Sequence, residues 1–198
     1  MQAAPLSLSS LIDHLEGLDS RSISQDLVSE LLAQTSISKA QLRPLLNFRP
    51  EKYTRNLIHR AEQFELMILC WPAGKTSPIH DHCDQLGWVR VLSGALEETG
   101  YTLAEGSSLE HEEAPCCVEP CFQGVQAAGT IVSAVDRYRG IHKLGALEED
   151  SVSLHIYSKP HDRCRVFDRE TQHLSWRPLA FDSKPNWRGS EQVGLGRA

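Results

Sequence analysis

Hydrophobic positions divide the chain into two parts with different periods. Up to residue 47, apolar side chains recur at steps of three and four residues, the spacing of one helix face. The two stripes are Leu8, Leu11, Ile12, Leu15 and Leu18, and Leu27, Val28, Leu31 and Leu32. Ser24 precedes the second stripe as an N-cap, and Ser38 with Gln41 makes a capping box. The pattern predicts N-terminal helices over residues 1–47 that pack through these stripes.

Further along the chain, short apolar runs rich in β-branched and aromatic residues are separated by Gly and Pro, which indicates strands. The predicted strands are Phe64 to Trp71, Leu86 to Leu92, Ala95 to Leu103, Thr130 to Val135, Ser151 to Tyr157 and Cys164 to Phe167. Strands at this spacing are typical of a sandwich or barrel. The polar, acidic stretch from Ala104 to Gly124 predicts a loop-rich excursion. The tail after Phe181 predicts an irregular wrap or a frayed end.

Length and organisation favour one domain. The chain has 198 residues, shows no internal repeat or linker, and can bury one sizeable core. We expect a single domain over 1–198, in which the helices of residues 1–47 pack on a barrel with its C-terminal wrap over 48–198.

Charge and cysteine content exclude several classes of protein. With 20 basic and 26 acidic residues, the chain has a net charge of −6, which does not attract nucleic acid. The longest apolar stretch, Leu66 to Trp71, is far shorter than the roughly 18 residues of a membrane span, and no basic residue before Arg21 marks a secretory leader. Six cysteines are too sparse for a disulfide scaffold. We expect a cytoplasmic monomer with reduced thiols and no nucleic-acid or membrane partner.

A histidine pair is the first candidate for chemistry. His80 and His82 stand two residues apart, so on a strand they project from one face and can chelate a metal. In a chain with nine histidines such a pair arises readily by chance, so its surroundings matter. Gly74 and Gly94 match the first cupin motif, G-x5-H-x-H-x3-4-E-x6-G, and Gly87 stands in place of its glutamate.

A third ligand is available further along the chain. His142 lies in a short segment before the Ser151 strand, from which it could reach the pair, although a lone histidine there is also typical of an exposed or hydrogen-bonded side chain. Without a carboxylate ligand, three neutral imidazoles leave the full dipositive charge on the metal. Such a site favours a soft anionic ligand such as a thiolate.

Two further clusters are compatible with a small-molecule site. Ser153, His155 and Tyr157 alternate with apolar residues along one predicted strand. By pattern alone this stripe is typical of a solvent-facing side, but facing a cavity it would form a hydrogen-bonded relay. Arg55 precedes the first predicted strand, where an arginine is commonly a surface charge, yet its planar fork is the preferred partner of a carboxylate.

Five segments in fixed order give the chain a family resemblance. They are Tyr53-Thr54-Arg55-Asn56-Leu57, Leu66-Met67-Ile68-Leu69-Cys70-Trp71, Ser77-Pro78-Ile79-His80-Asp81-His82, Ser153-Leu154-His155-Ile156-Tyr157-Ser158 and Asp162-Arg163-Cys164-Arg165-Val166-Phe167-Asp168. In these the chain resembles the cysteine dioxygenase family, the thiol dioxygenases of the cupin superfamily. The resemblance implies a mainly β fold, a cupin β-sandwich or jelly-roll barrel with N-terminal α-helices.

The same resemblance implies residue roles and a reaction. Ferrous iron, Fe(II), would bind to His80, His82 and His142. The family's hydrogen-bonded catalytic triad would be Ser153, His155 and Tyr157. Arg55 would hold the substrate carboxylate, and the pocket would be lined by Tyr53, Leu69, Trp71 and Cys164. The implied reaction converts L-cysteine and O₂ to cysteine sulfinate, with both oxygen atoms going to sulfur.

The chain departs from the family pattern at two positions. Animal members carry a cysteine where this chain has Gly87, and that cysteine forms a thioether with the triad tyrosine. We therefore expect Tyr157 to be a free phenol, as in bacterial-type members. Members often have Ser-Pro-Pro after the triad tyrosine, whereas Lys159 follows Ser158 here, which leaves the geometry of that peptide open.

Three alternatives remain at this point. A 3-mercaptopropionate dioxygenase would use the same iron and triad, but related members of that kind generally carry glutamine in place of Arg55. A metal-binding cupin could sense or store a small ligand without turnover. A zinc or nickel isomerase would fit three histidines but would leave the pairing of Arg55 with Tyr157 unexplained.

Overall fold

The structure is a computed structural model that describes residues 5–83, 85–109, 115–135 and 140–187, with the backbone alone for 132–135. Its helices are α1 (Leu8–Glu16), α2 (Gln25–Gln34) and α3 (Lys39–Leu42), followed by a 3₁₀ turn (Arg43–Leu45). Its strands are β1 (Thr54–Arg60), β2 (Phe64–Trp71), β3 (Ile79–His80), β4 (Gly87–Ser93), β5 (Ala95–Leu103), β6 (Val118–Ala127), β7 (Ile131–Val135), β8 (Ile141–Ala146), β9 (Ser151–Ser158), β10 (Arg163–Asp168) and β11 (His173–Pro178).

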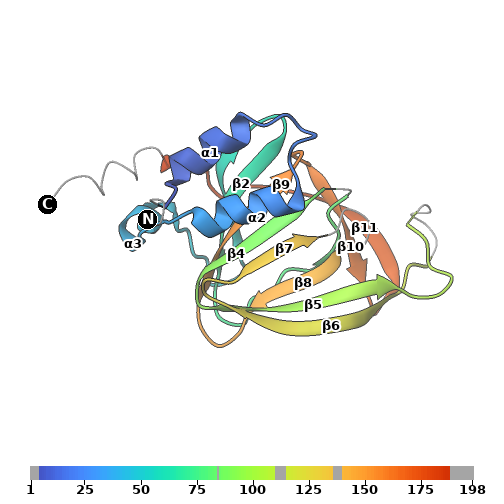
Figure 1. The fold of residues 1–198 in the computed structure, drawn as a ribbon. Coiled ribbons are helices and arrows are strands. Elements are labelled where there is room, and N and C mark those ends of the chain that lie inside the picture. The colour runs from blue at the N-terminus through green and yellow to red at the C-terminus, as the bar shows by residue number, and fades with distance from the viewer. Residues whose placement is uncertain (1–4, 84, 110–114, 136–139, 188–198) are drawn as a thin grey trace, which may run out of the picture.

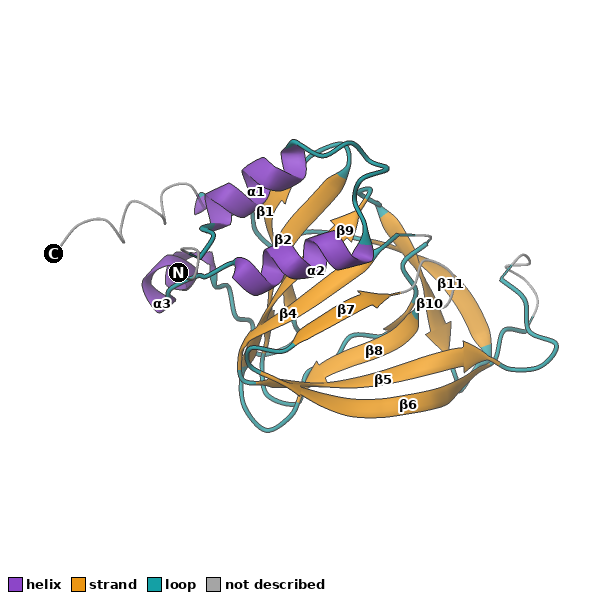
Figure 2. Cartoon of the chain, in the orientation of Figure 1, coloured by secondary structure: helices purple, strands orange, loops and turns teal. Residues whose placement is uncertain are grey.

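The strands form two antiparallel sheets that face each other. The first has the order β1-β2-β9-β4-β7 and the second the order β11-β10-β3-β8-β5-β6. Figure 2 shows the two sheets curving around a common interior, while the helices lie outside. The fold is therefore mainly β with N-terminal helices, as predicted.

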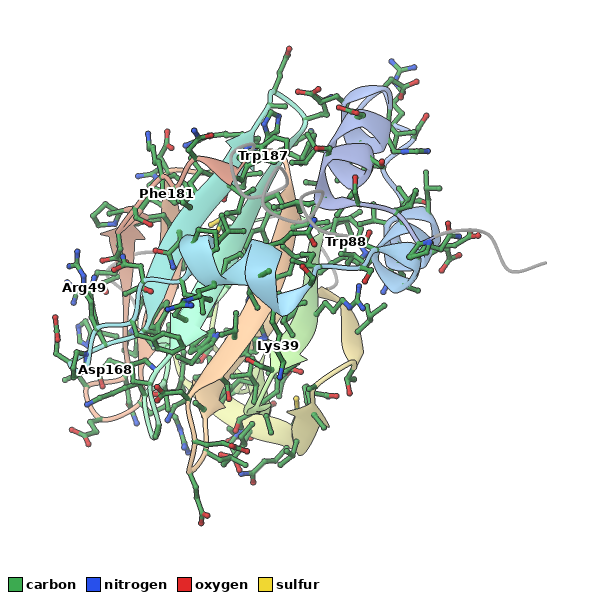
Figure 3. All side chains as sticks on the ribbon, turned by 90° about the vertical axis from the view of Figure 1, so that its left-hand side faces the viewer. Lys39, Arg49, Trp88, Asp168, Phe181 and Trp187 are labelled. Carbon is green, nitrogen blue, oxygen red and sulfur yellow. The ribbon has the colours of Figure 1, made fainter. Side chains whose placement is uncertain are left out.

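One hydrophobic core joins the helices to the first sheet. Helices α1 and α2 lie across the outer face of β2, β9 and β4 (Figure 1), and their leucine stripes are buried against Leu66, Ile68 and Leu154. Trp88 on β4 lies beneath the helices and donates its indole N–H to the carbonyl of Gln25 at 3.1 Å (Figure 3). The helical stripes therefore serve packing, as their period predicts.

A second core fills the space between the sheets. Met67, Leu69 and Trp71 point from β2 into this interior, where they meet Val89 and Leu144. Because helices cover one face of β2 and the second sheet covers the other, all eight of its residues are buried. This explains why Leu66 to Trp71 is an unbroken apolar run.

The predicted elements agree with the structure where a strand is buried. The strands expected at Phe64 to Trp71 and Ala95 to Leu103 have the predicted bounds, and the other four differ by one residue at one or both ends. Ser24 and Ser38 cap α2 and α3, with the capping box at Ser38 complete. Strands β1, β3, β8 and β11 were not predicted, because each is short or carries many polar residues.

The prediction of a loop-rich excursion from Ala104 to Gly124 is wrong from Val118 onward. β6 begins at Val118 and pairs with β5 along its length. It is an edge strand with most of its side chains exposed, so it lacks the alternation that marks a half-buried strand. Pro120 is tolerated there because it lies at a register irregularity on a sheet edge. Residues 110–114 of the predicted excursion lie outside the described residues.

The described part of the C-terminal segment contacts β1. Ser183 bridges to Asn56 in β1, and Trp187 is buried in the core that joins the helices to the first sheet. The final residues, 188–198, lie outside the described part. All six cysteines are free, as expected. Among the described residues, no helix is both long and apolar enough to span a membrane.

Candidate active site

Three histidines from neighbouring strands of the second sheet converge at one point. His80 ends β3, His82 lies two residues further along the chain, and His142 lies opposite His80 on β8. Their ring centroids are 4.8–5.0 Å apart, and one nitrogen of each ring lies within 4.8 Å of the others. The structure therefore brings together the three residues that the sequence singled out as metal ligands.

The hydrogen bonds of the three rings determine which nitrogen faces the centre. The Nδ1 atoms contact the Pro78 carbonyl at 3.0 Å from His80, the Gly140 carbonyl at 3.1 Å from His82, and the Glu98 carboxylate at 2.7 Å from His142. The Nε2 atoms of His82 and His142 are buried without any hydrogen-bond partner. Unpaired buried nitrogens are costly in a protein interior, and a bound metal ion would satisfy them. The donor set thus fits a metal.

The protonation of these rings is also suited to metal binding. Burial lowers the pKa of His80, and it lowers the pKa of His82 and of His142 much further, helped by the neighbouring imidazoles. A neutral imidazole keeps the lone pair that a metal needs.

Glu98 is a functional residue that sequence reasoning missed. It lies on β5, buried at 7% exposure, and its carboxylate accepts the Nδ1–H of His142. Carboxylates in this position orient a ligating histidine and raise its basicity. The Glu98 carboxylate therefore lies next to the three histidines, on the Nδ1 side of the His142 ring. The sequence held no signal for this role, because Glu98 sits in the polar pair Glu97-Glu98 more than forty residues before its partner.

Arg165 is a second residue that the sequence did not single out. Its backbone N–H and its Nε–H donate to Asp81 at 3.0 and 2.6 Å, and the Asp81 N–H donates to the Arg165 carbonyl at 3.1 Å. Asp81 lies between His80 and His82, so these bonds fix the ligand segment to β10. The pair holds two of the three histidines in place.

The polar stripe of β9 faces the interior and forms a continuous hydrogen-bonded row. Trp71 Nε1–H donates to Ser153 Oγ at 2.8 Å, Ser153 Oγ contacts His155 Nε2 at 2.7 Å, and His155 Nδ1 contacts Tyr157 Oη at 2.9 Å. The indole can only donate, so the row is satisfied when Ser153 donates to His155 and His155 donates to Tyr157. The proton of the Tyr157 hydroxyl is then free for a partner in the cavity.

Burial sets the protonation of the row. It lowers the pKa of His155 well below the usual value, so the ring stays neutral. It raises the pKa of Tyr157, and although Arg55 opposes this rise, the buried phenol keeps its proton. The stripe is therefore a buried relay and not the solvent-facing side that its pattern alone would suggest.

Arg55 reaches the same interior from β1. Its Nη1 is buried with no hydrogen-bond partner, while Nη2 lies 3.6 Å from the Met67 sulfur and 3.8 Å from a Glu65 oxygen. The Phe181 ring lies 5.2 Å from its guanidinium carbon. An unpaired buried guanidinium donor is a site for an anionic ligand.

One cavity of about 390 Å³ connects these groups. Its walls include the three histidines, Arg55, Glu65, His155 and Tyr157. The predicted lining residues Tyr53, Leu69, Trp71 and Cys164 border it as well, and the Tyr53 ring stacks on Trp71 at 4.7 Å. Of the residues predicted from the sequence for this site, Ser153 alone is not on the wall, because it lies behind His155.

The chain is similar in sequence to known proteins. The profile of the family described as cysteine dioxygenase type I matches residues 1–170. The chain belongs to that family. It is 32% identical over 197 residues to cysteine dioxygenase type 1 of Danio rerio, covering 98% of this chain and 94% of the relative. Identity to the Rattus norvegicus protein of the same name is 35% over 140 residues, covering 69% and 66%.

A solved structure gives a looser comparison. An RmlC-like cupin protein from Desulfovibrio desulfuricans matches with a TM-score of 0.40 and 19% identity, covering 59% of this chain and 91% of the other. The assignment to the cysteine dioxygenase type I family is carried by sequence.

A glycine lies opposite Tyr157 in the first sheet. Gly87 on β4 lies directly across from Tyr157 on β9. Gly87 has no sulfur to offer, which is the basis for expecting a free phenol. After β9, Lys159 has a left-handed backbone with φ of 62°, and the peptide bonds of the described residues are trans.

Proposed function

We propose that this chain is a cysteine dioxygenase, converting L-cysteine and O₂ to L-cysteine sulfinate at Fe(II) held by His80, His82 and His142. One observation carries the proposal. Unpaired imidazole nitrogens and the unpaired buried Nη1 of Arg55 belong to residues that line one cavity, which suits a ligand carrying both a metal-binding thiol and a carboxylate. Family membership supports the same reaction.

The roles of the residues follow from their positions. Arg55 binds the substrate carboxylate through Nη1 and so fixes the direction from which the thiol approaches. The stacked pair of Tyr53 and Trp71, with Leu69, excludes water around the reacting sulfur. Tyr157 holds a proton on Oη that can be donated to an anionic group in the cavity, and Ser153 and His155 keep that hydroxyl oriented.

The reaction balances without an external reductant. The thiol sulfur is oxidised to the sulfinate by four electrons, one O₂ is reduced, and both oxygen atoms remain on sulfur. Ferrous iron, when bound, supplies thiolate coordination and the activation of O₂. The protein supplies orientation, a dry site and fixed charges.

Metal analysis followed by oxygen uptake tests the proposal. The iron-loaded protein is given cysteine, 3-mercaptopropionate and cysteamine in turn, and the products are identified by mass. We expect cysteine to have the highest kcat/KM and to yield cysteine sulfinate. A preference for 3-mercaptopropionate would make the chain a thiol-acid dioxygenase, and no oxygen uptake with any of the three would make it a non-catalytic metal-binding cupin.

The assembly and compartment are proposed from the sequence alone. We propose a cytoplasmic monomer, with small molecules as its only partners. Gel filtration of the iron-loaded protein with light-scattering detection tests the assembly, because a monomer elutes at the chain mass of 22.1 kDa.

A further inference from the structure

Glu65 is a buried charge to which the proposed reaction gives no role. On β2 the side chains that face the interior are Glu65, Met67, Leu69 and Trp71, and Glu65 alone among them is charged. Its exposure is 1%. A buried carboxylate is costly unless its surroundings compensate the charge.

A bulge in β1 supplies part of that compensation. Between Leu57 and His59 the pairing of β1 with β2 shifts by one residue, so Arg60 and not His59 lies opposite Glu65. Bulges of this kind re-aim the side chains that follow them. The shift places a second guanidinium beside the carboxylate.

The result is a row of alternating charges from the surface to the cavity. Asp162, exposed at the outer end, lies 2.8 Å from Arg60 Nη2, and Arg60 Nε lies 3.8 Å from Glu65 Oε2. Glu65 Oε1 in turn lies 3.8 Å from Arg55 Nη2. Neither contact of Glu65 is a hydrogen bond, and its Oε2 has no hydrogen-bond partner. Glu65 therefore acts on Arg55 through charge and not through a directed bond.

The pKa of Glu65 depends on the same neighbours. Burial raises the pKa of the carboxyl, while Arg55 and Arg60 oppose the rise and Asp162 adds to it. Tyr157 lies opposite Glu65 on β9. The row thus consists of two acidic and two basic side chains, which balance in charge until a ligand carboxylate binds to Arg55.

We propose that Glu65 limits how tightly Arg55 holds a carboxylate, so that substrate and product bind more weakly and the product leaves. The inference rests on the proposed role of Arg55. The product carries a sulfinate as well as a carboxylate, so an uncompensated buried guanidinium would retain it. Binding that is equally strong in ground and transition states does not accelerate the chemical step, so weakening it costs nothing once substrate is saturating.

Glu65→Gln tests the inference, because it removes the charge and keeps the shape. A unit charge about 6 Å from a bound carboxylate, at an effective dielectric constant near 20, changes affinity by roughly one to two decades. Arg60 offsets part of this, so we expect the Kd of cysteine sulfinate and the KM of cysteine to fall about tenfold. The Kd is measured by calorimetric titration of the iron-loaded protein without oxygen. Tighter binding is a change that a merely damaged fold would not produce.

Two controls isolate the charge at this position. Cysteamine has no carboxylate, so its KM should change less than twofold in Glu65→Gln. Glu62→Gln removes an exposed charge from the same hairpin, outside the cavity, and should leave both constants unchanged.

Arg60→Gln provides a second variant with the opposite expected sign. Without Arg60, the charge of Glu65 acts on Arg55 without an outer counterion, so the Kd of cysteine sulfinate should rise by two- to fivefold. In the double variant Glu65→Gln/Arg60→Gln this rise should disappear, because Arg60 acts through Glu65. Arg60 is one-third exposed, so the replacement leaves the core intact.

The outcomes separate this inference from the proposed function. A fall of threefold or more in the Kd of cysteine sulfinate with Glu65→Gln, together with a rise for Arg60→Gln, supports it. A smaller fall, no change or a rise with Glu65→Gln overturns it, as does a fall for Arg60→Gln. The proposed function fails separately, when wild-type iron-loaded protein takes up no oxygen with cysteine, whatever the variants do to the Kd.

Discussion

In the proposed function, the choice of substrate depends on Arg55. Its Nη1 is buried, unpaired and on the wall of the cavity that the three histidines also line. A charge-assisted contact in such a place is worth roughly 1.5–3 kcal/mol. Arg55→Gln should therefore lower kcat/KM for cysteine by about one to two decades, with KM rising at least as much as kcat falls.

Cysteamine provides the control for that variant. It lacks the carboxylate and should lose far less activity, so oxygen uptake with both thiols separates recognition from general damage. Equal losses for the two thiols would mean that Arg55 is structural.

We expect the Glu98 carboxylate to support metal binding through its hydrogen bond with His142. Glu98→Gln keeps an acceptor for the Nδ1–H of His142 but removes the charge, so metal affinity should fall about tenfold or more. Competition with a chelator of known affinity measures the change. Glu97→Gln is the matched control, because Glu97 points outward and contacts Gln123. Unchanged affinity in Glu98→Gln would contradict the role.

Gly87 determines the chemical state of Tyr157. Because Gly87 lies directly opposite Tyr157 and carries no side chain, we expect no thioether. The intact mass of the purified, reduced protein should equal the sequence mass, without the loss of two hydrogens. A crosslinked peptide joining Tyr157 to another cysteine, such as Cys164, would refute this.

Strand β9 shows how a single element can serve two environments. Val152, Leu154 and Ile156 pack beneath the helices, while Ser153, His155 and Tyr157 face the interior. A period of two residues separates the faces. The cost of the polar face is that a titratable ring is buried at 1% exposure.

That buried ring predicts a pH dependence of stability. Burial holds the pKa of His155 well below 6.5. In mild acid this imidazole therefore binds a proton in the unfolded chain but not in the folded chain. The free energy of unfolding should fall as pH drops below about 6.5, with His155 contributing up to about 1.4 kcal/mol per pH unit. Urea unfolding of metal-free protein between pH 7.5 and 5.5 measures the slope.

The same experiment on two variants assigns the slope. His155→Gln should reduce the slope of unfolding free energy against pH by up to about 1.4 kcal/mol per pH unit, the value for one proton. His173→Gln, at an exposed position, serves as the control. An identical slope in wild type and His155→Gln would show that the ring is not protected from protonation.

At the scale of the whole molecule, the metal site joins strands that are distant in sequence. β3 and β8 each carry a proposed ligand, and the pairing of His80 with His142 joins these two strands in the middle of the second sheet. A metal that binds the folded chain alone stabilises it by mass action, by about 2.7 kcal/mol at 100 times the Kd. For a chain of this size that corresponds to a rise of roughly 5–10 °C in Tm.

Thermal unfolding with and without Fe(II), in the absence of oxygen, measures this rise. His142→Ala should lose most of it, along with most of the bound iron. Full stabilisation and full iron content in that variant would show that His142 is not a ligand.

Local patterns in the sequence determined the buried elements and the spacing of the candidate groups. The apolar run of β2, the capping box at Ser38 and the alternation along β9 are properties of neighbouring residues, so they can be read without the fold. The pair His80 and His82 belongs to the same class, because two residues on one strand face share a direction. Four unpredicted strands and β6 lack such signals, since they are short, polar or at an edge.

Only the tertiary structure decided which distant groups meet. Glu98 reaches His142 and Arg165 reaches Asp81 across strand pairings that join residues far apart in the chain. The position of Arg60 beside Glu65 depends on a one-residue shift in β1, for which the sequence shows no local pattern. Periodicity specifies the direction of a side chain on its own strand, whereas its partner is set by register and sheet order, which arise from the packing of the whole chain.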